Sequence, residues 1–323
     1  LGSFSDDAIL QRLLQVREQS TADAAVPPKI AEFDVFASGQ SLIGENRADS
    51  RLHAETLPRT IWAQSDAIGC AVLLKNVVAV HRLREVSCLY GFTRFEAAPS
   101  EADDELEDVY LAVDGATLSQ QATWLPAVEQ FGEGVFLHFD EDAVRSWLDQ
   151  PEVQARVAAL VQGHAAWAAS RRKQDFPGGG YIMLHSLSHA LMTEIALDCG
   201  YPASSLKERI YAIGEKHTGA PQRCGILIYT ATSGALGTLG GLVAAAARIS
   251  TIIENALERL RLCSNDPVCA DHAPQDSKDE RALHGAACHG CLLIAETSCE
   301  ARNAYLDRAL VIETVGEAQA AFF

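Results

Sequence analysis

The sequence predicts an α/β protein with a small mixed sheet in its N-terminal part and a helix-rich C-terminal domain. Short apolar or alternating runs lie between residues 71 and 139, while apolar residues recur at helical spacing after residue 140. A Phe-Pro-Gly-Gly-Gly run at 176–180 separates the helical segments into two groups and marks a boundary. We therefore divide the 323 residues into a mixed α/β region, 1–175, and a C-terminal domain, 176–323.

The N-terminal region is predicted to contain one helix followed by short strands. Residues 6–17 carry apolar side chains at helical spacing behind Ser5, which can act as an N-cap. The acidic run 101–108 is interpreted as a solvated loop. Because the chain begins with Leu1 rather than Met, we expect it to be part of a longer protein. Strands are predicted over residues 71–80, 86–92, 109–113 and 135–139.

Helical patterns dominate from residue 140 onward. Asp140 can cap a helix over 141–148, and a second helix is predicted over 152–171. Residues 181–199 predict a buried helix that ends at Gly200. The remaining elements are a short turn begun by Ser204 or Ser205, strands over 209–213 and 225–229, and one long amphipathic helix over 242–262.

Five of the nine cysteines are crowded into the last fifth of the chain. Two of them form the step Cys288-His-Gly-Cys291, which turns a pair of thiolates toward one ion. The pattern predicts a structural zinc site that holds one ion with four sulfur ligands. A disulfide framework and reduced core thiols are the alternatives. The candidate ligands are Cys263, Cys269, Cys288, Cys291 and Cys299, with His272, His284 and His289 nearby.

The remaining four cysteines, Cys70, Cys88, Cys199 and Cys224, stand in apolar surroundings. Each is interpreted as a small buried hydrophobic residue.

The net charge of −17 argues against a surface that grips nucleic acid, because phosphate binding requires lysine and arginine. The short basic stretches 81–84 and 171–173 lack aromatic residues for stacking and are interpreted as solvated edges. No apolar run is long enough for a membrane helix, and the N-terminus lacks a signal-peptide pattern. We therefore expect a cytoplasmic location, where thiols stay reduced.

His185 and His189 lie four residues apart on a predicted helix and so face the same way. The zinc-peptidase pattern would place a Glu directly after the first histidine, but Ser186 stands there. We therefore expect the two imidazoles to be hydrogen-bonded by Ser186 and Ser188 in a buried interface. No nucleophile elbow is present, and the glycine-rich run 234–241 has the wrong spacing for a phosphate loop.

Several sequence segments, most of them in the second half, resemble one family: His185-Ser-Leu-Ser-His189, Cys199-Gly-Tyr-Pro202, Gly225-Ile-Leu-Ile-Tyr229 and Cys288-His-Gly-Cys291 through Arg308, with 84–94 upstream. The chain is similar to the DrmB components of the DISARM phage-defence system, which contain the zinc-binding domain also found at the C-terminus of certain bacterial superfamily 2 helicases. Cys263 and Cys269 are more widely spaced than in the helicases, and His289-Gly290 replaces Pro-Ser in the knuckle, which favours the DrmB branch.

The resemblance implies a non-catalytic accessory subunit that associates with a DISARM helicase, DrmA, and helps it engage foreign DNA. The ATPase chemistry would then lie in that partner, and direct contact of this chain with DNA is left open. The alternative is an enzyme, a metal-dependent hydrolase or nuclease that uses the helix carrying His185 and His189.

Overall fold

The computed structural model describes residues 26–64, 69–89, 91–92, 116–118, 124–168, 175–214, 221–230, 232–233, 240–272, 274, 283–316 and 319–323. The predicted helix 6–17, the strand 109–113 and the acidic run 101–108 lie outside these residues. Most of the glycine-rich run 234–241 also lies outside them; only Gly240 and Gly241 of this run are described.

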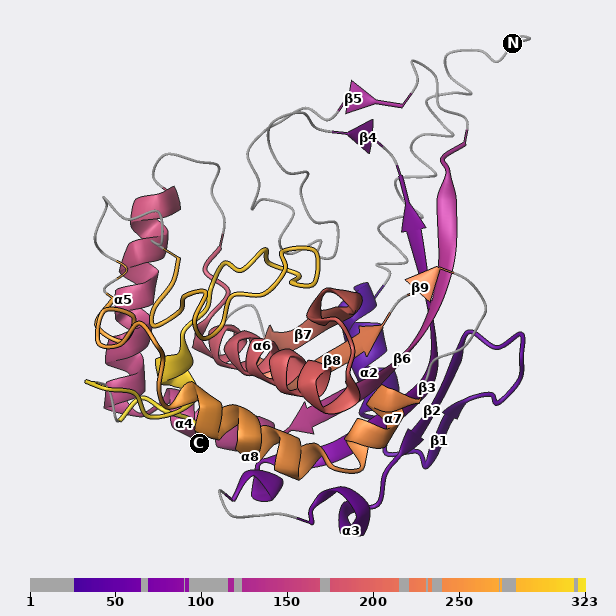
Figure 1. Ribbon diagram of the computed structural model, residues 1–323, viewed down its shortest axis with the longest axis horizontal. Coiled ribbons are helices and arrows are strands. Elements are labelled where there is room, and N and C mark those ends of the chain that lie inside the picture. Colours follow the sequence, from indigo (N-terminus) through magenta and orange to yellow (C-terminus); the bar gives the residue numbers. More distant parts are fainter. Residues whose placement is uncertain are drawn as a thin grey trace, which may run out of the picture.

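One antiparallel sheet forms the centre of the described structure (Figure 1). Its strands follow the order β1-β2-β3-β6-β8-β7, and β9 adds to β6. The predicted sheet is therefore present, and every pairing among its strands is antiparallel. The strands are β1 (Leu42–Gly44), β2 (Leu52–Thr56), β3 (Leu74–Cys88), β6 (Ala127–Phe139), β7 (Leu206–Gly214), β8 (Pro221–Thr230) and β9 (Thr232–Ser233); β4 (Gly91–Phe92) and β5 (Ala116–Thr117) pair separately.

Strand β3 is one continuous strand where the sequence predicted two. The polar residues from His81 to Glu85 suggested a break, but the backbone ladder to β6 continues through them after a register shift between Val80 and Leu83. Polar side chains are tolerated here because this end of the strand is more exposed than its buried start. Pairing with a neighbouring strand therefore extends the element beyond its apolar run.

The sheet includes strands from both sides of the predicted boundary at residue 175. β6 pairs with β3 on one side and with β8 on the other, for example through Gly134 and Tyr229. The division into residues 1–175 and 176–323 stays a prediction.

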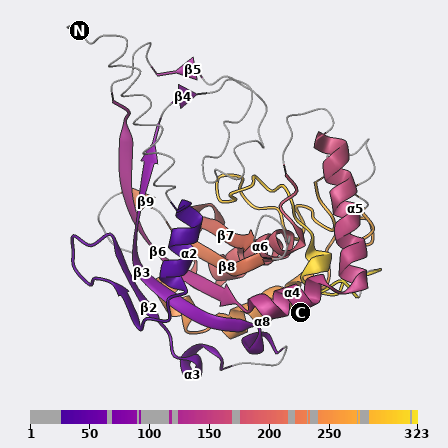
Figure 2. The same cartoon turned by 180° about the vertical axis from the view of Figure 1, so that it is seen from behind.

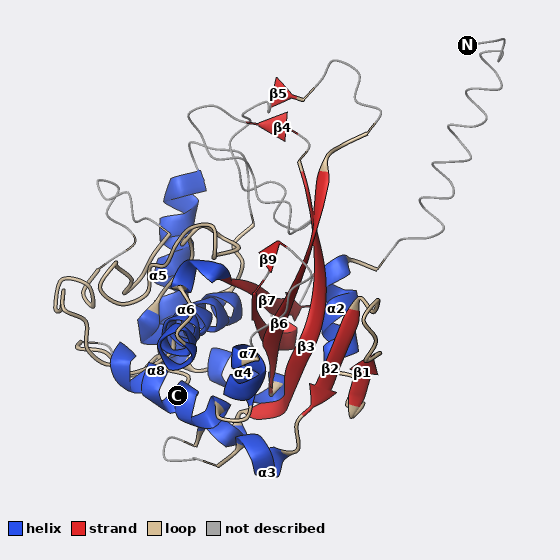
Figure 3. Ribbon diagram, turned by 45° about the vertical axis from the view of Figure 1, so that its right-hand side comes forward, coloured by secondary structure: helices blue, strands red, loops and turns tan. Residues whose placement is uncertain are grey.

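Both faces of the sheet are covered (Figures 2 and 3). Side chains alternate along β6, so that Val135 and Leu137 enter the larger core and Phe136 enters a smaller one. The smaller core lies under α2 (Pro28–Phe36), whose Phe33 and Phe36 contact it. The larger core is formed with the helices of the opposite face and with the C-terminal segment.

The helices that begin at residues 141 and 179 confirm their predictions. α4 (Glu141–Leu148) starts at Asp140, whose carboxylate accepts a hydrogen bond from the Asp142 amide at 2.9 Å. α6 (Gly179–Cys199) is buried along most of its length and ends at Gly200, whose φ of 71° is the left-handed conformation that glycine adopts easily. Between them, α5 (Pro151–Ala168) corresponds to the helix predicted over 152–171.

The prediction of one long helix over 242–262 is wrong. The structure has two helices there, α7 (Gly241–Ala246) and α8 (Ile249–Leu260), with non-helical torsions at Arg248. Their main contacts differ: α7 packs on β3 and β6 and also touches α6, whereas α8 packs on α6, so the chain changes direction between them. The apolar pattern alone could not show this change of partner.

The segment after α8 has little regular structure in its described part. It contains the short 3-10 helix η4 (Arg308–Leu310) and one isolated bridge, yet it buries Leu306, Leu310 and Ile312 in the larger core. The yellow trace in Figure 1 follows it along α5 and α6. The remaining short elements are α3 (Arg59–Trp62), η1 (Cys70–Val72) and η3 (Ala203–Ser205).

No helix in the described part of the chain is long and apolar enough to cross a membrane.

Candidate metal centre

Four of the five candidate cysteines converge after α8. The sulfurs of Cys263, Cys269, Cys288 and Cys291 all lie within 4.8 Å of one another. The distance is 3.4 Å between Cys263 and Cys288, and 3.8 Å both between Cys269 and Cys291 and between Cys288 and Cys291. Sulfur–zinc bonds of about 2.3 Å in a tetrahedron require sulfur–sulfur distances of about 3.8 Å. The four thiols therefore fit one zinc ion.

None of the nine cysteines forms a disulfide. The disulfide framework, the first alternative to a metal site, is therefore wrong. The zinc prediction is confirmed by this tetra-cysteine group together with the domain match given below.

The turn from Cys288 to Cys291 places two of the thiols. The Cys291 amide donates to the Cys288 carbonyl at 3.1 Å, while the Cys288 and Gly290 amides donate to the sulfurs of Cys291 and Cys288 at 3.3 Å each. A Cβ on Gly290 would lie 2.7 Å from Ser264 Oγ and 3.3 Å from Cys263 Sγ. Glycine is required here because the turn approaches the Cys263 segment so closely.

The surroundings of the four thiols favour the ionised form of Cys269, whereas burial raises the pKa of Cys263 and the contact with Cys269 raises the pKa of Cys291. Asn265 donates its backbone amide to Cys263 at 3.5 Å and its side-chain amide to Cys288 at 3.2 Å. The pKa of Cys269 is lowered to about 6, chiefly because Cys291 donates a hydrogen bond to its sulfur, with a further contribution from the Arg308 guanidinium. The thiolate is the form that binds metal, so Cys269 is the thiol that these contacts prepare for a cation.

Arg308 is held in place by groups other than the thiols. Its side chain is fully buried, donates to the Leu260 carbonyl at 2.7 Å and pairs with Asp266. Leu260 is the last residue of α8, so this arginine joins the helix end to the thiol group.

The fifth candidate, Cys299, lies in a different group. It is close to His185, His189 and Glu208, with ligand atoms that all lie within 4.8 Å of one another, and all four residues are buried. The nearby histidines do not join the four thiols among the described residues; His284 instead contacts the Asn303 carbonyl through Nε2 at 2.5 Å.

The predicted partners of His185 and His189 are wrong. Ser186 donates to the Ile182 carbonyl at 2.7 Å, and Ser188 Oγ has no hydrogen-bond partner in the described structure. The imidazoles instead contact Glu208 and Cys299. Ser186 cannot reach them because its hydroxyl bonds back to the preceding helical turn, as helical serines often do.

Sequence reasoning missed Glu208 because it assigned this residue to a turn. The structure places it in β7, where its side chain points toward α6. The available signal was that Glu208 lies two residues from both Leu206 and Ile210. In a strand these three side chains point to the same face, which places the carboxylate among buried apolar residues.

The interpretation of the other cysteines holds for two of four. Cys70 and Cys224 are buried, but Cys199 is half-buried and Cys88 is exposed. Cys88 ends β3 on its more exposed part, beyond the cover of the core.

The fold and the four thiols define a protein that carries a zinc-binding domain. Residues 187–292 match the family model of the MrfA Zn-binding domain, a range that includes all four thiols and ends before Cys299. The chain is 34% identical over 253 residues to the DISARM protein DrmB of Bacillus paralicheniformis, which confirms the resemblance found in the sequence. The match covers 77% of this chain and 42% of that relative.

A solved structure also aligns with part of the chain. It is the crystal structure of the DUF1998 helicase MrfA bound to DNA, at 14% identity and a TM-score of 0.27. The alignment covers 73% of this chain and 21% of that one. At this score the two folds are not shown to be alike.

Proposed function

We propose that this chain is part of a DrmB-type component of a DISARM anti-phage defence complex. The single observation that carries the proposal is the 34% identity over 253 residues to DISARM protein DrmB. The match covers 42% of that relative, so any activity of the whole relative is carried over to this chain only as part of the proposal. In it, the chain is a non-catalytic accessory subunit that associates with the helicase subunit DrmA, and helicase chemistry lies in that partner.

The zinc has a structural role in this proposal. Cys263, Cys269, Cys288 and Cys291 would supply all four ligands of a tetrahedral ion, which leaves no position for a substrate. The ion would join the end of α8 to the segment that follows it. Residues 176–323 would then form the helicase-associated part of the subunit, with residues 1–175 as its mixed α/β region.

DNA would be engaged mainly through the complex. A net charge of −17 disfavours close approach of the whole surface to phosphates, so a protein partner is the better match for this chain. A cytoplasmic location fits the nine reduced cysteines, since free thiols persist in a reducing compartment.

Affinity purification from the native host tests the association. A tagged chain should bring down a DISARM helicase subunit, DrmA, at a salt concentration that disrupts nonspecific DNA binding. The exposed variant Cys88→Ser serves as a matched control and should retain the partner, because Cys88 lies outside both residue groups. Recovery of the chain without any helicase, from cells that express the whole defence system, would contradict the proposal.

The alternative class, a hydrolase or nuclease that uses His185 and His189, is less well supported. Both imidazoles are 0% exposed, so neither lies where a substrate could reach it. Purified chain supplied with divalent metal should leave single- and double-stranded DNA intact. Cleavage that disappears in the His185→Ala/His189→Ala variant, with the fold retained, would favour the enzyme instead.

A further inference from the structure

A second group of potential ligands lies in the core, apart from the four thiols. His185 and His189 come from α6, Glu208 from β7 and Cys299 from the C-terminal segment. His185 Nε2 lies 3.0 Å from Glu208 Oε1 and 3.1 Å from Cys299 Sγ, and His189 Nε2 lies 3.1 Å from the same carboxylate oxygen. Three segments far apart in sequence thus aim four ligand atoms at one point.

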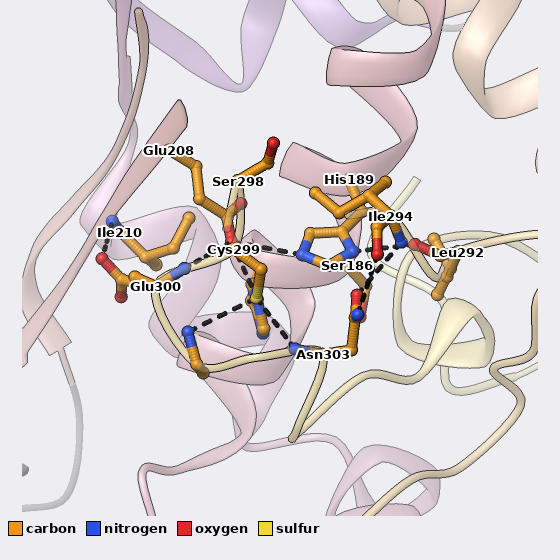
Figure 4. Close-up of polar contacts among 12 residues, drawn as sticks. Ser186, His189, Glu208, Ile210, Leu292, Ile294, Ser298, Cys299, Glu300 and Asn303 are labelled. Atoms are coloured by element: carbon orange, nitrogen blue, oxygen red, sulfur yellow. Dashed lines mark hydrogen bonds and ion pairs between the residues drawn. The ribbon is translucent and has the colours of Figure 1, made fainter. Parts of the chain in front are cut away.

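Backbone carbonyls fix the orientation of both imidazoles. His185 Nδ1 lies 3.1 Å from the Tyr305 carbonyl, and His189 Nδ1 lies 2.7 Å from the Leu292 carbonyl. A carbonyl can only accept, so each Nδ1 carries a proton, and in its neutral form each ring turns the Nε2 lone pair toward Glu208 and Cys299. Metal-binding histidines are oriented in this same way by a second acceptor. In Figure 4 the His189 side chain lies between Leu292 on one side and Glu208 on the other.

The inward-facing atoms repel one another unless a positive charge lies among them. Without such a charge, the Nε2 lone pairs of both imidazoles face a carboxylate and a thiol. Water cannot screen these groups from one another, because the His185, His189 and Glu208 side chains are 0% exposed. The other carboxylate oxygen, Glu208 Oε2, has no hydrogen-bond partner in the described structure. A divalent cation would balance the carboxylate and a thiolate and leave the buried group neutral.

The surroundings of Cys299 repeat those of the four-thiol group. Its sulfur accepts the amide of Ala301, two residues on, at 3.3 Å, just as Cys263 accepts from Asn265 and Cys288 from Gly290. The Asn303 amide adds a second bond to the same sulfur at 3.1 Å. Such amide contacts stabilise a thiolate ligand.

An unusual backbone supports this arrangement. Arg302, Asn303 and Tyr305 have φ values of 52°, 63° and 59°, which non-glycine residues seldom adopt. These torsions direct the Asn303 amide to Cys299 and the Tyr305 carbonyl to His185. Strain of this kind persists where the surrounding contacts demand it, often at a binding site.

Glu300 fixes the position of its neighbour Cys299. Its carboxylate accepts from the Ile210 amide at 3.0 Å (Figure 4) and from the Tyr181 hydroxyl at 2.9 Å, which ties the segment to β7 and α6. The fourth ligand therefore does not depend on the ion alone for its placement.

We propose that His185, His189, Glu208 and Cys299 bind a second divalent metal ion, zinc, in a closed structural site. Ideal tetrahedral distances between nitrogen, oxygen and sulfur ligands of zinc are about 3.3–3.6 Å, close to the 3.0–3.1 Å contacts of this group. Imidazole nitrogen, carboxylate oxygen and thiolate sulfur together suit zinc, which accepts all three. With four protein ligands and no solvent access, the ion would fasten the C-terminal segment to α6 and β7.

Protonation of the histidines is the alternative to a bound metal ion in this group. Burial alone lowers the pKa of His189, but Glu208 raises it to about 9, so a protonated cluster could also balance the carboxylate. The two occupants differ in metal content, which can be measured directly.

Metal content of the purified 323-residue chain tests the proposal. Zinc should be present during purification, with loosely bound ions removed by desalting, and mass spectrometry of the elements then counts ions per chain. We expect two. The variants Cys299→Ser and His189→Asn should each lose half of the bound zinc, and Cys224→Ala, a buried cysteine outside both groups, should keep all of it. One ion per chain in the unaltered protein would overturn the proposal, as would full zinc content in both variants.

X-ray absorption at the zinc edge tests the second site on the unaltered chain, so its result does not depend on whether the variants fold. The unaltered chain should show a ligand shell in which sulfur is mixed with nitrogen and oxygen. A shell of sulfur alone would show that zinc occupies only the four-thiol group and would refute the second site.

Discussion

Asp307 and Arg156 form a two-pronged ion pair between the C-terminal segment and α5. Arg156 Nε lies 2.7 Å from Asp307 Oδ2, and its terminal nitrogen lies 3.1 Å from Oδ1. The Asp307 carboxylate is fully buried and also accepts the amides of Ala286 and Ala309 at 2.9 and 3.0 Å. One carboxylate thus joins a helix to two parts of a segment that has little regular structure.

Removal of this carboxylate should strongly destabilise the protein. Asp307→Ala removes the shared acceptor of two buried amides and the bidentate partner of the partly buried Arg156 guanidinium, a loss of about 3–5 kcal/mol of unfolding free energy. Urea unfolding followed by circular dichroism measures it. The control Arg47→Ala breaks an exposed pair with Asp49 and should leave the midpoint unchanged. Equal midpoints for both variants would show that the buried pair contributes no more than a surface pair.

Gly285 should not tolerate a side chain, for a reason linked to the same carboxylate. A Cβ at this position would lie 2.2 Å from Asp307 Oδ2 and 2.3 Å from its Cγ. Gly285→Ala must therefore displace Asp307, and we expect a loss of about 1–3 kcal/mol. In the Asp307→Ala background the obstacle is gone, so the added methyl should cost far less. A cost that is the same in both backgrounds would contradict the steric explanation.

Loss of the four-thiol ion should loosen the chain locally rather than everywhere. In Cys288→Ser/Cys291→Ser, zinc should be lost and amide hydrogen exchange should accelerate over 261–272 and 283–294, where the chain has little regular structure of its own. The ladder between β3 and β6 should keep its protection. Cys88→Ser is the control and should match the unaltered chain. Unchanged exchange together with unchanged zinc would mean that these thiols are not its ligands.

The contacts of Glu141 should make stability sensitive to acid. Burial alone would raise the pKa of this carboxyl, but hydrogen bonds from His138 and Lys75 lower it to about 2. A depressed pKa stabilises the fold above the unfolded value near 4.5, and this contribution is lost as the pH falls toward 2. Because Lys75 is partly solvated, we expect about 1–2 kcal/mol.

The variant Glu141→Gln isolates this contribution. The difference in unfolding free energy between the unaltered chain and the variant should be constant above pH 5 and shrink below about 4.5, since only the unaltered chain carries the Glu141 carboxyl that takes up a proton there. Other acid-sensitive groups, including the thiols, are common to both proteins. A difference that stays constant down to pH 3 would contradict the assignment.

Local signals made several features predictable from sequence. Asp140 caps α4 and Gly200 ends α6 because each position is decided by its own backbone and side-chain chemistry. The Cys288 to Cys291 step was likewise readable, since its two thiols are brought together by one short turn.

Long-range contacts decided the features that the sequence did not show. The helix break at Arg248 reflects two different packing partners, and the polar stretch of β3 stays in the sheet because β6 pairs with it. Cys299 resembles the other cysteines in sequence, but the backbone after it turns toward His185 instead. Glu208 could be connected with this histidine only once β7 and α6 were seen side by side.

The place of β6 between β3 and β8 limits how the chain can be shortened. A truncated protein that began at residue 176 would keep β7 and β8 but lose the strand that pairs with the other side of β8. The amide and carbonyl groups that face β6 between Gly225 and Tyr229 would face water beside an apolar surface, which invites edge-to-edge aggregation. Recombinant versions of the zinc-binding part will therefore need residues 74–139 in the same polypeptide or supplied as a co-expressed fragment.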